Sequence, residues 1–234
     1  MVRLNGAPLY IMKKILFLLT MLLLSPNVYS STRDSLNIKF NPLLNGEKII
    51  HTSQQHPKDQ LLTIKLFKFY VSNFTINYKD GSSEIIDKVF LYNLTKKESW
   101  MIQLPKSSVK EVESVLFTIG LDSLTTKNSD MENELDPIHG MFWSWRAGYI
   151  NYKIEGSYKN NKNNQPFVFH IGGNSQDYNT TFTVKKIDQG TDTLITDIEL
   201  KPVLDFLNDN RKKTIMSIND DSLSFSQFFK KCFQ

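Results

Sequence analysis

The sequence has one cysteine, little net charge and no apolar run of membrane-spanning length. Cys232 has no second cysteine for a disulfide within the chain, and the missing CxxC and CxxCH patterns exclude dithiol redox chemistry and covalent haem attachment. The formal net charge is +4, and it falls to about +1 when residues 1–30 are set aside. A nearly neutral surface argues against nucleic-acid binding, which needs a strong basic footprint.

The N-terminal region has the pattern of a secretory signal. Met12 precedes two lysines, residues 15–24 are apolar apart from one threonine, and Val28 and Ser30 offer small side chains three positions and one position before a cut. Ten helical residues rise only about 15 Å, half of a bilayer core, so we expect no membrane span. We therefore expect a signal peptide at residues 1–30, with the true start at Met12. Residues 31–234 are then one exported domain, periplasmic or secreted.

Strand patterns dominate the rest of the chain. β-Branched and aromatic residues recur in short segments, and turn signals such as Asn45-Gly46 and Asp80-Gly81 separate them. The expected strands are residues 36–40, 61–78, 85–94, 99–104, 112–121, 141–154, 167–171, 180–187 and 193–200.

The remaining segments are short. Helix-like spacing occurs at residues 203–209 and 221–233, a polar connector covers 122–135, and an Asn/Lys-rich hairpin loop covers 157–165. None of these is long enough to divide the chain. The pattern predicts an all-β fold, an antiparallel β-sandwich with one or two short helices near the C-terminus.

Two of the three tryptophans lie close together in HGMFWSWRAGY, residues 139–149. If residues 141–154 form one strand, Trp143 and Trp145 share a face because side chains alternate. Two tryptophans on one face are typical of a sandwich core. The other interpretation is that they belong to a metal site.

Histidines support the second interpretation. His139 comes just before the tryptophans, and His170 ends the strand FVFHI. Imidazole suits copper, zinc, nickel and iron, and two neutral imidazoles are a natural start for a copper site. A lone histidine at a strand end is, however, more often a hydrogen-bonded surface group.

Four segments of the chain together resemble the signature of the MbnP family. They are ELDPIHGMFWSWRAGYINYKIEG (134–156), FHIGG (169–173), KLFKFYVSNF (65–74) and FTIGLDS (117–123). They occur in the family's order, and the resemblance runs from about residue 36 to about residue 200.

The resemblance implies an exported β-sandwich that binds copper for capture or delivery. In this family and in related copper-repressible surface proteins, a partner di-haem, peroxidase-like enzyme can oxidise a tryptophan to kynurenine. An indole nitrogen is only a donor, whereas the opened ring offers an amine and a ketone to a metal. The resemblance thus implies His139 and His170 as copper ligands and either Trp143 or Trp145 as the kynurenine precursor.

The position of His170 is difficult in a plain hairpin. A hairpin centred near residue 161 places His170 opposite Tyr152, seven residues from Trp145, or about 23 Å along a strand. A bulge at Gly148, or pairing with another strand, would be needed to bring the two together. His51 is the substitute ligand.

A different class of function is also open. The chain could be a metal-free adhesion or ligand-binding module with the tryptophans as core or as a platform for sugars. We do not expect an enzyme, because no serine–histidine–acid order or nucleophile elbow is present, and Asp122, Asp136 and Glu155 are expected in turns and loops.

Overall fold

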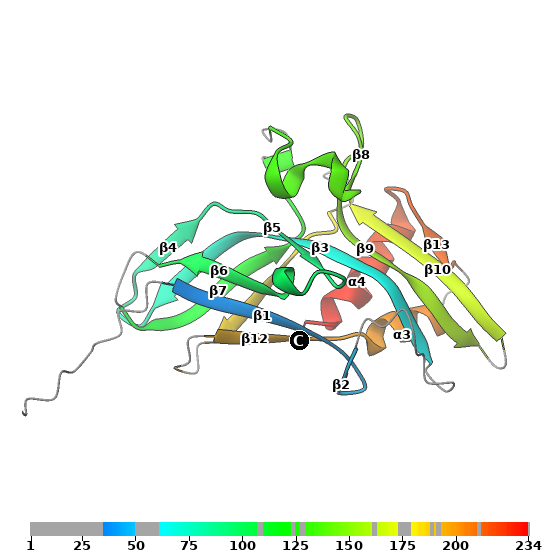
Figure 1. The fold of residues 1–234 in the computed structure, drawn as a ribbon, viewed down its shortest axis with the longest axis horizontal. Helices are drawn as coiled ribbons and strands as arrows, with labels where there is room; N and C mark the ends of the chain where they lie inside the picture. Colours follow the sequence, from blue (N-terminus) through cyan, green and yellow to red (C-terminus); the bar gives the residue numbers. More distant parts are fainter. Residues whose placement is uncertain are drawn as a thin grey trace, which may run out of the picture. The chain divides into compact units, whose positions relative to one another are not determined.

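The computed structural model consists mainly of strands arranged in two sheets (Figure 1). It describes residues 35–49, 61–106, 110–122, 125–126, 130–160, 163–172, 179–187, 190, 193–209 and 212–233. All of these belong to one compact unit, Arg33–Gln234. The expected signal peptide and His51 lie outside the described residues.

The smaller sheet is built around the first strand. Strand β1 pairs in parallel with β12 and in antiparallel fashion with β2 and β6. The four strands are β1 (Ser35–Leu44), β2 (Glu47–Lys48), β6 (Met101–Pro105) and β12 (Thr193–Glu199).

The larger sheet has the order β11-β7-β3-β9-β10-β13, with β4 and β5 also paired to β3 and β8 to β9. All its pairings are antiparallel except β10 with β13. The strands are β3 (Leu62–Tyr78), β4 (Ser83–Ile86), β5 (Phe90–Asn93), β7 (Val112–Ile119), β8 (Phe142–Ser144), β9 (Gly148–Asn160), β10 (Asn163–Gly172), β11 (Phe182–Ile187) and β13 (Thr214–Ile215).

Two α-helices follow the last long strand, as expected. They are α3 (Lys201–Asp209) and α4 (Asp220–Lys231), and short 3₁₀ turns form η1 (Lys97–Trp100), η2 (Asn133–Leu135) and η3 (Pro137–His139). Helix α4 begins at a capping box in which the side chains of Asn219 and Ser222 each accept a bond from the other's backbone N–H. None of the helices in the described part of the chain is long and apolar enough to cross a bilayer.

The prediction of an all-β sandwich with short helices near the C-terminus is confirmed. The sheets are mixed rather than wholly antiparallel, because β1–β12 and β10–β13 run in parallel. Alternation within a strand is the same in both arrangements, so the sequence pattern could not distinguish them.

Strand β3 alternates between the core and the opposite face, and Asn73 adjusts that alternation. Val71 and Phe74 are both buried in the core although they lie three residues apart. Asn73 between them has φ 52°, a left-handed value that asparagine tolerates better than most residues. The pairing of β3 with β7 shifts register at this point. The extra residue therefore forms a bulge that keeps both apolar side chains inside.

The core between the sheets is rich in aromatic rings. Phe40 of the smaller sheet makes edge contacts with Phe69, Tyr92 and Phe117 of the larger sheet at centroid distances of 5.4 to 5.9 Å. Phe229 of α4 lies 4.3 Å from Tyr152 in the same measure. The smaller sheet and α4 thus both cover the inner face of the larger sheet.

Three expected segments differ from the structure. Residues 85–94 form two strands, β4 and β5, rather than one. Residues 141–154 are not one strand, because the chain turns between β8 and β9, where Gly148 has φ 78°. The predicted loop at 157–165 is largely strand, with Asn160 paired to Asn163.

We expect Phe229→Ala to lower the free energy of unfolding by about 3–5 kcal/mol, because this buried ring packs against several core rings. Phe228→Ala is the matched control, since Phe228 is the adjacent residue of α4 and is only partly buried. Urea unfolding followed by far-ultraviolet circular dichroism measures both variants. An equal loss in the two would contradict this account of α4.

Candidate functional site

Residues 130–147, here called the outer segment, lie on the face of β3 and β9 that is turned away from the core. A second apolar cluster, separate from the main core, attaches the segment to the sheet. Its buried members are Tyr70, Leu91, Leu121, Met141, Tyr149 and Ile150. Figure 1 shows β8 and the neighbouring turns above β3 and β9, while β1 and β12 lie below them.

Two buried tyrosines fix the first half of the outer segment. The Tyr70 hydroxyl donates to the Glu134 carbonyl at 3.1 Å, and the Tyr149 hydroxyl donates to the Leu135 carbonyl at 2.9 Å. Burial raises the pKa of Tyr70 far above its usual range, so its hydroxyl stays protonated and can donate.

Two lysines hold the turn that carries His139. The Lys68 ammonium donates to the His139 carbonyl at 2.8 Å, and the Lys153 ammonium donates to the Gly140 carbonyl at 3.2 Å. Burial, followed by the nearby Lys153 charge, lowers the pKa of Lys68. Lys68 and Lys153 are register partners on β3 and β9, so one row of the sheet supports the whole turn.

The His139 ring is oriented by η2, the 3₁₀ turn that precedes the one carrying His139. Its Nε2 lies 2.8 Å from the carbonyl oxygen of Asn133. A carbonyl only accepts, so Nε2 carries a hydrogen, and in the neutral tautomer of the ring Nδ1 then keeps its lone pair. The turn that carries His139, η3, begins at Asp136, whose carboxylate accepts from the Ile138 N–H, and ends at Gly140 with φ 68°. Asp136 therefore caps a 3₁₀ turn, which agrees with the expectation of a turn residue.

His170 lies on the same face of the sheet. In the register it is opposite Lys153, which is itself opposite Lys68, so the three side chains point the same way. Its neighbour Phe169 points to the core and lies 4.5 Å from the Phe225 ring. Two strand spacings separate Lys68 from His170, or about 10 Å between Cα atoms.

The His170 imidazole is buried, with 7% of the residue exposed, and it is held by a carboxylate. Its Nε2 lies 2.7 Å from Glu155 Oε1, and the Lys153 ammonium lies 3.8 Å from the same oxygen. Burial lowers the pKa of His170, and the Lys153 charge lowers it further, although the bond to Glu155 opposes this. A neutral ring that donates through Nε2 keeps its Nδ1 lone pair.

The observed register corrects the expected one by one residue. His170 is opposite Lys153 and not Tyr152, and the pairing of β9 with β10 is irregular between Ile171 and Gly172. Trp145 also does not lie along an extended strand from His170, because the chain turns back before β9. The estimated separation of about 23 Å along a strand therefore does not apply.

The two tryptophans do not share one face, and neither lies in the main core. Trp143 is half-buried against the second apolar cluster. Trp145 lies in the turn after β8 with 83% of the residue exposed, and its ring centroid is 5.9 Å from that of Phe142. The interpretation of the pair as sandwich core is thus wrong, since the hairpin places one ring inward and the other in solvent.

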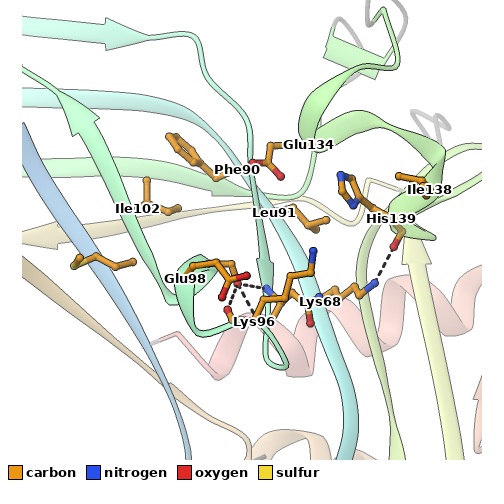
Figure 2. Close-up of a pocket in the computed structure, with 12 residues that line it drawn as sticks. Lys68, Phe90, Leu91, Lys96, Glu98, Ile102, Glu134, Ile138 and His139 are labelled. Atoms are coloured by element: carbon orange, nitrogen blue, oxygen red, sulfur yellow. Dashed lines mark hydrogen bonds between the residues drawn. The ribbon is translucent and has the colours of Figure 1, made fainter.

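A cavity of about 500 Å³ opens beside His139 (Figure 2). It lies between the outer segment on one side and β5, η1 and β6 on the other. Its lining combines apolar, polar and charged side chains: Lys68, Phe90, Leu91, Asn93, Lys96, Glu98, Ser99, Met101, Ile102, Glu134, Ile138 and His139.

As separate donors, the two histidines suit copper. Each has one ring nitrogen engaged by an oxygen acceptor, an arrangement that fixes the tautomer and directs the other nitrogen in metal sites. Yet no group of three or more His, Cys, Asp or Glu side chains in the described ranges is arranged to hold a metal. Further ligands would have to come from a modified side chain or from residues outside these ranges, such as His51.

Sequence reasoning missed three charged residues that lie between the histidines: Lys68, Lys153 and Glu155. Alternation in β3 indicates that Lys68 faces away from Phe67 and Phe69. It cannot show that the His139 carbonyl lies within hydrogen-bond distance of the Lys68 ammonium. Glu155 was expected in a turn or loop and is instead in β9, bonded to His170. The pairings of β3 with β9 and of β9 with β10 bring these residues together.

The family model for MbnP matches residues 33–217, which is most of the sequence. The chain belongs to the MbnP family. Among solved structures, its fold is similar to that of MbnP from Methylosinus trichosporium, with a TM-score of 0.52 and 14% sequence identity over 73% of this chain and 77% of that chain. At this identity the similarity concerns the fold. No curated protein matches the sequence.

We expect Lys68→Met to loosen the turn at residues 137–140. Hydrogen exchange at the Gly140 amide, which donates to the Pro137 carbonyl, should become about tenfold faster, because a partly exposed charged hydrogen bond is lost. Lys65→Met is the control, since Lys65 is exposed on the same strand. The same exchange rate in both variants would show that Lys68 does not hold this turn.

Proposed function

We propose that this chain is an exported, periplasmic or secreted, copper-binding protein that captures or delivers the metal. His139 and His170 are the proposed protein ligands, and a kynurenine formed from Trp143 or Trp145 is the third. The proposed partner is a di-haem, peroxidase-like enzyme. Membership of the MbnP family supports this proposal, together with the resemblance of the segments around residues 134–156 and 169–173 to that family's signature.

One structural observation supports it most directly. His139 and His170 lie on the same side of the larger sheet, and both have Nε2 engaged by an oxygen, so that Nδ1 remains available. Neutral imidazoles of this kind are common copper ligands. Lys153 lies near both histidines: its ammonium donates to the carbonyl of Gly140, next to His139, and lies close to Glu155, which bonds His170. A cation bound near it would meet some repulsion, which the Glu155 carboxylate would offset.

Exposure favours Trp145 over Trp143 as the modified residue. Trp145 projects from a turn where a partner enzyme could reach it, whereas Trp143 contributes to the second apolar cluster. Oxidative opening of the indole would make an aromatic amine and a ketone available to copper. Trp100 is the internal reference, because its indole nitrogen already donates to the carbonyls of Asn93 and Leu94 at 3.2 Å.

The second candidate is a metal-free ligand-binding module. Two observations favour it: the described residues contain no three-ligand metal cluster, and the exposed Trp145 ring could act as a platform. It predicts a protein that leaves its native host without copper and with all its indoles intact.

We expect His139→Ala and His170→Ala each to weaken copper binding by more than tenfold in a chelator competition assay, because each removes an imidazole ligand. Glu155→Gln should weaken it less, by about tenfold, because it alters only the group that orients His170. If both alanine variants hold copper as tightly as the parent protein, the ligand assignment is wrong and His51→Ala is the next variant.

We expect peptide mass mapping of protein from its native host to find kynurenine at Trp145 and unmodified indole at Trp100. Protein made in a host without a di-haem partner should keep all three indoles and bind copper more weakly. Modification at Trp143 would reverse the preference between the two residues. Unmodified Trp143 and Trp145 in copper-loaded native protein would contradict kynurenine ligation.

A further inference from the structure

The cavity beside His139 contains charged side chains that the rest of the fold does not use. Lys96, Glu98 and Glu134 line it, and none of these three forms a side-chain ion pair or hydrogen bond within the described part of the chain. Lys68 also lines it and bonds the His139 carbonyl, although an ammonium has three hydrogens to donate. The cavity thus presents two positive and two negative groups.

Five of the other residues that line the cavity are apolar. Leu91 and Ile102 are buried and Phe90 is half-buried, so they form a hydrophobic inner wall. Two more apolar residues that line the cavity are exposed: Met101 is 52% and Ile138 is 82% accessible. Exposed apolar side chains beside a polar cavity are what an amphipathic ligand would cover. Figure 2 shows Ile138 and Ile102 on opposite sides, with the Lys96 side chain between them.

The charges indicate which class of ligand fits. A simple anion would be attracted by the lysines and repelled by the glutamates, and a simple cation would meet the reverse. A molecule with one group of each charge can pair with both the lysines and the glutamates, and an apolar body can pack against the apolar walls. We infer that this cavity binds a short zwitterionic peptide with apolar side chains, its carboxylate at Lys68 and Lys96 and its ammonium at Glu98 and Glu134.

This inference goes beyond copper binding and does not depend on it, so copper-free protein provides the test. The indole N–H of Trp100 is a suitable reporter, because it bonds the carbonyl of Asn93, a residue that lines the cavity. Leucyl-leucine is the probe, and its N-acetylated and C-amidated forms each lack one charge. We expect leucyl-leucine to shift this NMR signal saturably and each capped form to bind about tenfold more weakly.

Paired variants test the residues. Lys96→Met should weaken binding of leucyl-leucine by about tenfold, while Lys97→Met, at an exposed neighbour that does not line the cavity, should leave it unchanged. Glu134→Gln should weaken leucyl-leucine in the same way but have no effect on the N-acetylated form, which has no ammonium to lose. Glu132→Gln is the control for that pair.

Three results would overturn the inference. They are the absence of a saturable shift with leucyl-leucine, equal effects of Lys96→Met and Lys97→Met, and an equally strong, Lys96-dependent shift with inorganic phosphate, which would make the cavity an anion site. Because no copper is present in these titrations, their outcome is separate from that of the chelator competition.

Discussion

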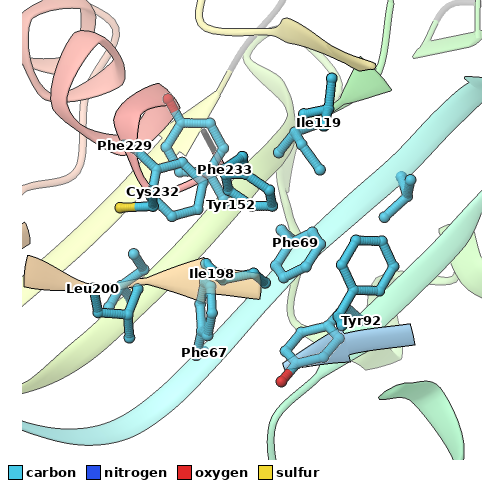
Figure 3. Packing of buried hydrophobic residues seen from close by; sticks show 14 of the residues in the cluster. Phe67, Phe69, Tyr92, Ile119, Tyr152, Ile198, Leu200, Phe229, Cys232 and Phe233 are labelled. Carbon is cyan, nitrogen blue, oxygen red and sulfur yellow. The ribbon is translucent and has the colours of Figure 1, made fainter. Parts of the chain in front are cut away.

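The packing of Phe67 and Phe69 of β3 against other aromatic rings determines the direction of the side chains between and beside them. Phe69 stacks on Tyr92 at 4.5 Å and Phe67 contacts Phe229 of α4 at 6.0 Å (Figure 3). Phe40 of the smaller sheet lies 5.4 Å from Phe69, so these rings connect both sheets and α4. Alternation then directs Lys68 and Tyr70 to the opposite face. The attachment of the outer segment depends on that consequence, because it rests on bonds from these two residues.

The two faces of the larger sheet are stabilised by different kinds of interaction. The inner face has a large, continuous aromatic and aliphatic core. The outer face has a small apolar cluster supplemented by polar and charged hydrogen bonds to backbone carbonyls. Stability is not uniform within a structure, and regions with few buried apolar contacts open at a lower free energy. The outer segment should therefore open locally more easily than the core. Binding residues are often placed in regions of this kind, where ligand-dependent rearrangement costs little.

Much of the fold follows from the sequence because alternation is a local property. The long run at 61–78 and the segment at 112–121 have buried residues at alternate positions, and both are strands. The turn between β8 and β9 was missed because its residues, including Trp145 and Ala147, continue an apolar pattern, and Gly148 was the only signal. The segment 157–165 was missed for the opposite reason. Its polar composition resembles a loop, but pairing of β9 with β10 overrides composition.

The candidate site was less predictable because it depends on contacts between distant segments. His139 and His170 could be selected as donors from the sequence, but Glu155 and Lys153 could not be connected to them without the register of β3, β9 and β10. This register also explains how one row of side chains takes part in both proposed sites. The lysine row holds the turn that orients His139 and also forms a wall of the cavity through Lys68. A ligand that binds only when the turn at residues 137–140 is ordered stabilises that turn by mass action. The proposed copper ligand His139 and the cavity share this turn, so binding at one is expected to favour binding at the other.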